Sequence, residues 1–347
     1  MNPADLVLTA ADGAAFWLPV AWLGVIGFGV LMYVLLDGFV LGLGILAPLA
    51  EDSDQLDHMM NTAAPIWDGN ETWLVLGGAG LFAAFPLAYS VVLTALYLPL
   101  LIMLIALIFR GVAFEFRFKA KRTRHVWDAA FIWGSIVATF AQGVLLGAFI
   151  EGIKVENRQF AGGAFDWLAP FPLFCGAGLV AGYAMLGCAW LLMKTEGKLR
   201  HKMYKLMLPL TSLLLLFIAV VSIWTPLAHE SIAQRWFTLP NLFYFIPVPT
   251  LVAVTILGIV RAVHLKIDWQ PFVLTLVLIA LAYTGLAISL WPNIIPPAVS
   301  IWEASAPASS QAFALVGVVF MVPIILIYTA YSYWVFRGKV KVGEGYH

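Results

Sequence analysis

Long apolar segments alternate with short polar connections along almost the whole chain. A transmembrane helix needs roughly 20 predominantly apolar residues to cross a hydrocarbon core about 30 Å thick. Nine segments meet this condition, and their approximate cores are residues 16–47, 72–89, 91–109, 126–150, 171–193, 206–224, 243–260, 272–290 and 313–336. The pattern predicts an all-α, polytopic membrane protein with nine transmembrane helices.

Two details of this pattern affect the expected fold. The first segment is longer than a membrane requires, so it must tilt or protrude. The second and third segments lie so close together that we expect a tight turn at about residues 86–90 between them. The longest polar connection has about twenty residues, which leaves no room for a soluble domain. We therefore expect residues 1–347 to form a single integral membrane domain.

The composition supports the membrane assignment. Hydrophobic residues make up 62% of the 347 residues and charged residues 11%, with a mean hydropathy of +0.93. A soluble domain has roughly 45–50% apolar and 25% charged residues. The formal net charge is zero, so charge gives no reason to expect a nucleic-acid partner.

The distribution of basic residues predicts the orientation. Short loops rich in Lys and Arg stay in the cytoplasm. With nine spans, 15 Lys and Arg residues fall on the side of the C-terminus and three on the other side, with Arg110 at the end of the third span. We expect the N-terminus outside and the C-terminus in the cytoplasm. The connection at residues 51–71 should then be cytoplasmic, although it has no basic residue.

Several polar residues are expected at one depth, close to the cytoplasmic face. Counting 1.5 Å per residue places Asp37 about 30 Å below the outer end of the first span. The others adjoin the same level at the ends of the second, third and fourth spans: Asp68, Asn70, Glu71, Arg110 and Asp128. Ionisable groups at membrane depth are functional candidates, and acids with one arginine are typical of a proton entry. We expect Asp68 and Asp37 to carry protons and the other four to support them.

A structural alternative explains part of this cluster. Asp68 and Asn70 precede an apolar run and could cap a helix whose first N–H groups lack acceptors. Arg110 could pair with Glu115 in place of an acid from another span. Gln142 lies in the middle of the fourth span, where a structural hydrogen bond is the expected role.

Aromatic residues near the span ends are candidates for contact with a partner or with the membrane interface. Trp67 and Trp73 bracket the polar cluster, and Trp302 with Glu303 lies in the last outer connection. A tryptophan of the aromatic belt is the simplest interpretation of Trp302.

The histidines argue against haem ligation by this chain. A haem in a membrane needs His or Met ligands on helix faces. All six histidines fall at span ends or in loops: His58, His125, His201, His229, His264 and His347. The chain also has no C-x-x-C-H motif and no Cys/His pattern typical of a metal site. We expect no haem and no metal ligated by this chain.

Five motifs, in order along nearly the whole chain, resemble subunit II of cytochrome bd-type quinol oxidases, including the cyanide-insensitive branch. They are LDGFVLGLGIL at 36–46, WDGNETWL at 67–74, FRGVAFEFR at 109–117, MKTEGKL at 193–199 and VPIILIYTAYSYW at 322–334. The most specific is WDGN ahead of an apolar run. Glu303 departs from the pattern, because some relatives have Asp after the tryptophan.

The resemblance implies a bacterial cytoplasmic membrane complex that passes electrons from quinol to O2 and draws protons from the cytoplasm. Its larger partner, subunit I, would hold two haem b, one haem d and the quinol-oxidising loop. It also leaves room for a small accessory subunit and a bound quinone. The acids of the family's proton path correspond to Asp68 and Asp37 here.

Two other functions fit the same acids. A stand-alone proton-coupled transporter would use them to couple protons to a solute, although no internal repeat is visible. A purely structural scaffold would need neither acid for activity.

Overall fold

The computed structural model describes residues 13–340 and is almost entirely helical. The long helices are α1 (Ala14–Leu46), α3 (Trp67–Ala84), α5 (Tyr97–Phe116), α6 (Arg124–Glu151), α7 (Pro170–Lys194), α8 (Gly197–Ala228), α11 (Pro247–His264), α12 (Gln270–Leu290) and α14 (Ala308–Val335). The short ones are α2 (Ser53–Asn61), α4 (Pro86–Ala95), α9 (Glu230–Phe237), α10 (Asn241–Phe245) and α13 (Ile301–Ala304), with a 3₁₀ turn at Ala47–Leu49. Two small antiparallel hairpins pair β1 (Val155–Glu156) with β2 (Gln159–Phe160) and β3 (Asn293–Ile295) with β4 (Val299–Ser300).

The prediction of an all-α polytopic membrane protein is confirmed. Within residues 13–340, eight helices are long and apolar enough to cross a membrane. The second predicted span corresponds to α3, whose polar first turns lower its hydropathy. It runs antiparallel to α14, since Asn70 contacts Tyr333 at one end and Ala84 contacts Ala306 at the other. The number of nine spans and the orientation of the termini stay predictions.

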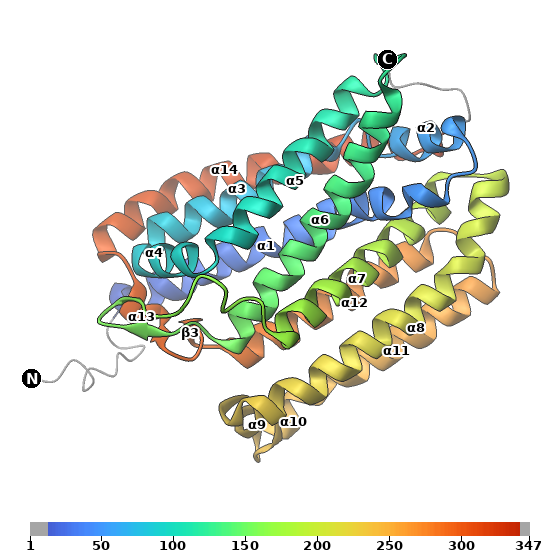
Figure 1. Cartoon of the computed structure of the whole chain (residues 1–347). Coiled ribbons are helices and arrows are strands. Elements are labelled where there is room, and N and C mark those ends of the chain that lie inside the picture. Colours follow the sequence, from blue (N-terminus) through green and yellow to red (C-terminus); the bar gives the residue numbers. More distant parts are fainter. Residues whose placement is uncertain (1–12, 341–347) are drawn as a thin grey trace, which may run out of the picture.

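The helices form a layered bundle around α1 (Figure 1). In that view α14, α3 and α5 lie on one side of α1, and α7 and α12 lie on the other, with α8 and α11 as an outer pair. We call the end that carries α2 and residues 336–340 the tail end, and the end that carries the two hairpins the hairpin end. The main hydrophobic core lies near the tail end, where Phe39 stacks on Trp190 at 4.1 Å between ring centroids.

Prolines set the start of several helices. Pro86, Pro170, Pro247 and Pro271 all lie in the first turn of their helices. A backbone N–H in the first turn has no acceptor within the helix, so proline, which lacks this N–H, loses no hydrogen bond there. The fixed φ of proline also matches that of a helix.

The prediction of a tight turn at 86–90 was wrong. Pro86 begins the separate helix α4, and α5 then runs from Tyr97 to Phe116. The third span therefore lies about two turns further along the chain than the predicted 91–109. Its last two turns remain helical because they include buried residues such as Arg110, Ala113 and Phe114, which face the interior of the bundle.

Glycines allow α1 to approach its neighbours closely. A Cβ at Gly42 would lie 2.8 Å from the backbone N of Gly187 on α7, and one at Gly44 would collide with Ser135 on α6. Without side chains at these points the backbones come into contact, as small residues commonly permit in membrane helices.

Replacement of Gly42 by Ala should therefore destabilise the protein by about 1–3 kcal/mol, because the backbone of α7 cannot yield as a side chain would. The Tm of the purified protein measures this loss. Gly24→Ala in the same helix is the matched control, since a Cβ there meets nothing within 4 Å. Ala is otherwise the better helix former. Equal Tm values for the two variants would contradict the proposed contact.

Candidate functional site

A buried arginine joins two acids from different helices. Nη2 of Arg110, on α5, lies 2.6 Å from Oδ2 of Asp37 on α1 and 2.9 Å from Oε1 of Glu71 on α3. The side chains of Arg110 and Asp37 are completely buried, whereas that of Glu71 is 32% exposed. We call these three residues the Arg110 cluster. Buried charges persist in proteins when they are paired, which explains why the acids and the base meet here.

Neighbouring side chains fix the cluster in place. The guanidinium of Arg110 lies 5.7 Å from the ring centroid of Trp67, which stacks in turn on Phe114 of α5. Asn70 donates through Nδ2 to the carbonyl oxygen of Leu36 at 2.8 Å and accepts from the hydroxyl of Tyr333 at 3.0 Å. Asn70 thereby ties α3 to α1 beside Asp37 and to α14.

The capping alternative is not what the structure shows. Ile66 is the N-cap of α3, and no side chain caps that helix end. Arg110 pairs with Asp37 and Glu71 and not with Glu115, which instead lies 3.8 Å from Lys119 on the exposed surface.

The Arg110 cluster keeps unused hydrogen-bonding capacity. Among the described residues, Nε and Nη1 of Arg110 and Oδ1 of Asp37 have no hydrogen-bond partner although all three atoms are buried. Buried polar groups without a protein partner are the points at which proteins bind internal water. The cluster can therefore exchange hydrogen bonds with small polar molecules.

A chain of polar side chains adjoins Asp37. Nε2 of Gln142 on α6 donates to the hydroxyl of Tyr33 at 2.8 Å, and the hydroxyl of Tyr183 on α7 donates to Oε1 of Gln142 at 3.2 Å. Tyr33 lies one helical turn before Asp37 on α1 and is buried, as is Tyr183. Gln142 thus makes hydrogen bonds to side chains of two other helices, which fits the structural role expected from the sequence.

The prediction that Asp128 belongs with Arg110 was wrong. Asp128 pairs with Arg117, which is fully buried and also pairs with Asp57 of α2, and Asp57 in turn pairs with Arg124. Arg117 lies seven residues beyond Arg110 on α5, so the two arginines share one face about 10 Å apart. Counting residues along the spans gives only the depth of Asp128, which is similar to that of Arg110. It does not show which of the two arginines the fourth span faces.

Asp68 lies apart from the buried pair. It is exposed in the first turn of α3, three residues before Glu71, and forms no ion pair with a described residue. Residues three apart on a helix lie on the same side. Asp68 therefore continues the acidic surface that begins with Glu71, and its predicted part in a proton path stays a prediction.

The aromatic candidates have different surroundings. Trp73 is fully buried and packs edge-on against Phe28 of α1, so it serves internal packing and cannot contact a partner. Trp67 is half-buried beside Arg110. Trp302 stacks on Phe16 and donates to its carbonyl oxygen at 3.2 Å, while Glu303 completes a capping box with Ser300 at the start of α13.

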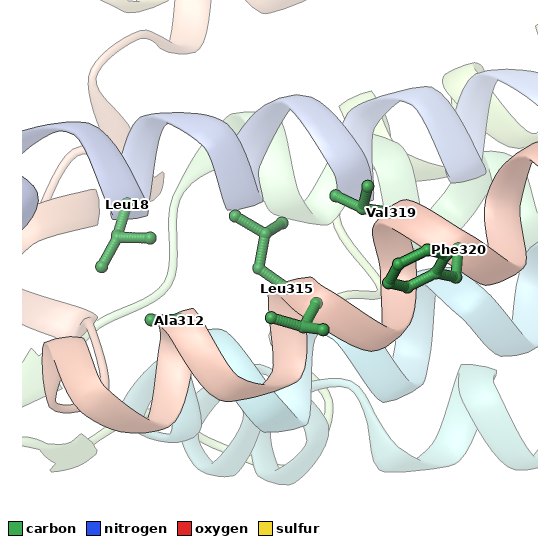
Figure 2. Close-up of a pocket in the computed structure, with 6 residues that line it drawn as sticks. Leu18, Ala312, Leu315, Val319 and Phe320 are labelled. Atoms are coloured by element: carbon green, nitrogen blue, oxygen red, sulfur yellow. The ribbon is translucent and has the colours of Figure 1, made fainter.

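No metal site is found in residues 13–340, which contain no group of three His, Cys, Asp or Glu residues suited to one. An apolar hollow of about 270 Å³ lies between Leu18 of α1 and a row of residues on α14 that includes Ala312, Leu315 and Phe320, and Figure 2 shows these lining side chains. Its lining has no polar side chain, so it offers hydrocarbon packing and no acid–base chemistry.

Sequence reasoning missed Tyr33, Tyr333, Asp57 and the role of Arg117. A signal existed for two of them. Tyr33 precedes Asp37 by four residues, the spacing that places two side chains on one helix face. Arg117 follows Arg110 by seven residues, which repeats the same face of α5. Tyr333 and Asp57 come from remote segments, and nothing local marks them.

The chain matches known proteins over most of its length. The family model described as cytochrome bd terminal oxidase subunit II matches residues 18–336. Cytochrome bd-I ubiquinol oxidase subunit 2 of Escherichia coli K12 is 28% identical over 361 residues, covering 92% of this chain and 94% of that one. Cytochrome bd ubiquinol oxidase subunit 2 of Bacillus subtilis is 28% identical over 324 residues, with 90% and 94% coverage.

A solved structure supports the same fold. The structure of bd oxidase from Geobacillus thermodenitrificans superimposes with a TM-score of 0.65 at 17% identity, covering 90% of this chain and 98% of that one.

The Arg117 ion pairs generate a pH prediction. Burial acts to raise the pKa of Asp57, but hydrogen bonds from Arg124 and Arg117 outweigh it and hold the pKa below its ordinary value. Such a group stabilises the fold above its unfolded pKa of about 3.9, and this stability is lost as the pH falls through the lower folded pKa. Asp57→Asn should lower the stability at pH 7 by about 1–3 kcal/mol.

The difference in Tm between native protein and Asp57→Asn should be largest near neutral pH and shrink in acid. Glu115→Gln is the control, because its ion pair with Lys119 is exposed and such pairs contribute little. A penalty that is the same at all pH values would point to lost packing instead.

Proposed function

We propose that this chain, which belongs to the cytochrome bd terminal oxidase subunit II family, carries protons from the cytoplasm towards the O2-reducing centre of its complex. Members of this family are part of a quinol:O2 oxidoreductase complex, and the chain is an enzyme subunit of that kind. The matched relatives cover more than nine-tenths of the chain and are oxidase subunits, which leaves the transporter hypothesis without support.

The Arg110 cluster carries this proposal. Two carboxylates share one guanidinium, so the cluster has a formal charge of −1 when both acids are ionised. Burying net charge is costly, and one proton taken up by either acid neutralises the cluster. The cluster is therefore neutral when it holds one extra proton and carries one negative charge when it has released that proton. A buried group that alternates between these two states suits a proton relay.

The acids are graded in exposure along the proposed path. Asp68 is exposed, Glu71 is 32% exposed and Asp37 is completely buried. A proton entering at Asp68 could pass to Glu71 and then to Asp37, while the guanidinium of Arg110, which both acids contact, stays charged throughout. The basic residues of the long connections gather at the tail end, which supports a cytoplasmic location for the entry. Reduction of one O2 to two waters consumes four protons, which this path would help to supply.

The haems belong on the partner in this proposal. Axial ligands on membrane helices come from His or Met. The described histidines all lie at helix ends or between helices, and His58 is bonded to the carbonyl oxygen of Val340. These residues do not fit a haem held within this chain. Two haem b and one haem d on subunit I, which also oxidises the quinol, would complete the enzyme in the bacterial cytoplasmic membrane.

Subunit I would cover the face formed by α3 and its neighbour α14. Exposed carboxylates such as Asp68 and Glu71 are costly against lipid, so a protein surface is the better neighbour. Large apolar side chains surround them on the same side, including Val75 at 68% exposure and Tyr328 at 64%. A small accessory subunit and a bound quinone or lipid are compatible with the remaining apolar surface.

Neutralisation of Asp68 tests the path. In a purified complex with its normal haem spectrum, Asp68→Asn should lower quinol-driven O2 consumption by about tenfold or more, because a proton-transfer group commonly contributes that much. Asp37→Asn should have an effect at least as large, since Asp37 is paired and buried.

Glu156→Gln, an exposed acid of the β1–β2 hairpin, is the control and should leave turnover unchanged. Unchanged turnover of Asp68→Asn with full haem content would remove Asp68 from the path. Loss of haem in the variants would instead assign the acids to the subunit interface. Purification through a tag on this chain identifies the partner, and the absence of any haem absorption would contradict the oxidase assignment.

A further inference from the structure

We propose that Tyr33 is a positioning residue for Asp37, held by Gln142 and Tyr183 so that its hydroxyl proton points at the free carboxyl oxygen of that acid. The inference rests on the proposed relay function of Asp37 and deepens it by naming the residues that set the geometry of the buried acid.

The first observation is the direction of the hydrogen bonds. The hydroxyl oxygen of Tyr33 accepts from Nε2 of Gln142 at 2.8 Å, and Oε1 of Gln142 accepts from the hydroxyl of Tyr183 at 3.2 Å. An amide nitrogen is a donor only, so Tyr33 cannot give its own proton to Nε2. The proton of Tyr33 is therefore free for another acceptor.

The second observation is an acceptor without a donor. Oδ2 of Asp37 is bonded to Arg110, whereas Oδ1 is buried and has no hydrogen-bond partner among the described residues. Tyr33 is buried and precedes Asp37 by four residues on α1, the spacing that places two side chains on one face of a helix. A hydrogen bond from the Tyr33 hydroxyl to Oδ1 would satisfy both groups.

Buried polar groups decide between the two amide orientations of Gln142. In the opposite orientation Tyr33 would donate to Gln142, and Oδ1 of Asp37 would remain buried without a donor. An unmade hydrogen bond to a buried charged group costs more than an ordinary one. With Gln142 in the orientation that the structure shows, the proposed bond gives Asp37 two donors, Arg110 at Oδ2 and Tyr33 at Oδ1.

This arrangement has a consequence for the relay. Arg110 is shared with Glu71, so the ion pair alone does not hold Asp37 in one rotamer. A donor on the other oxygen, itself fixed by residues of α6 and α7, sets the carboxyl plane. Gln142 and Tyr183 contact neither Arg110 nor Glu71 through a hydrogen bond, so they act through Tyr33.

Tyr33→Phe in the purified complex tests the inference by infrared spectroscopy. The carboxyl stretching band of Asp37 is identified as the one that disappears in Asp37→Asn or moves in Asp37→Glu. Loss of the Tyr33 donor should move the C=O band of the protonated state of Asp37 to higher frequency, because a C=O group with fewer hydrogen bonds is stiffer. O2 consumption should fall about tenfold or more, as expected for a lost hydrogen bond to a charged group.

Tyr283→Phe is the matched control. Its hydroxyl also donates to α1, at the carbonyl oxygen of Gly27 at 2.9 Å, but away from Asp37. It should leave the band and turnover unchanged. Gln142→Leu keeps the Tyr33 hydroxyl but removes the amide that donates to it. This variant should move the same band, and it therefore tests the inference even if the Tyr33→Phe complex fails to assemble.

The outcomes separate the two proposals. A band that stays in place in both variants overturns the role of Tyr33. A band that moves while turnover is unchanged supports the hydrogen bond but overturns the positioning role of Tyr33, and the test of Asp37 itself remains Asp37→Asn. When Tyr33→Phe and Gln142→Leu are combined, the effects should not add, because they act on one contact. Additive effects would show that Gln142 does not act through Tyr33.

Discussion

The ion pair between Arg110 and Asp37 is the constraint on which the rest of the structure depends. Neither side chain is exposed at all, and removal of either partner would leave an uncompensated charge within the bundle. The pair can form only if α5 remains helical past Arg110 and lies in register with α1. Trp67 and Asn70 at the start of α3 then close the cluster from a third helix.

A second buried arginine at the end of α5, closer to the tail end, forms similar ion pairs. Arg117 joins Asp57 of α2 and Asp128 of α6, so α5 places two buried guanidinium groups against acids from four other helices. Glycine contacts such as Gly134 of α6 against the backbone of Ala106 and Arg110 on α5 bring these helices close together. Charge pairing fixes the order of the helices, and close packing fixes their distances.

The proposed division of chemistry between the two subunits has a physical reason. Haem ligands on membrane helices are His or Met, and in residues 13–340 the histidines lie at helix ends or between helices, while methionines such as Met103 and Met185 pack in the hydrophobic core. Acids with an arginine can bind and release protons without a cofactor. This subunit would therefore handle protons, and its partner would handle electrons, with Asp68 and Glu71 on the face between them.

The sequence by itself determined the membrane class, the positions of most spans and the shared level of Asp37 and Arg110. These properties depend on hydrophobicity and on a rise of 1.5 Å per residue, which are local. It did not determine the separate helix α4, the burial of Trp73 or the exposure of Asp68.

Only the tertiary structure decided which polar residues meet. Asp128 and Asp37 lie at depths that sequence counting could not separate, yet one pairs with Arg117 and the other with Arg110. The choice follows from the rotation of each helix about its axis and from its neighbours. Both are set by packing between segments far apart in the chain, which no local pattern records.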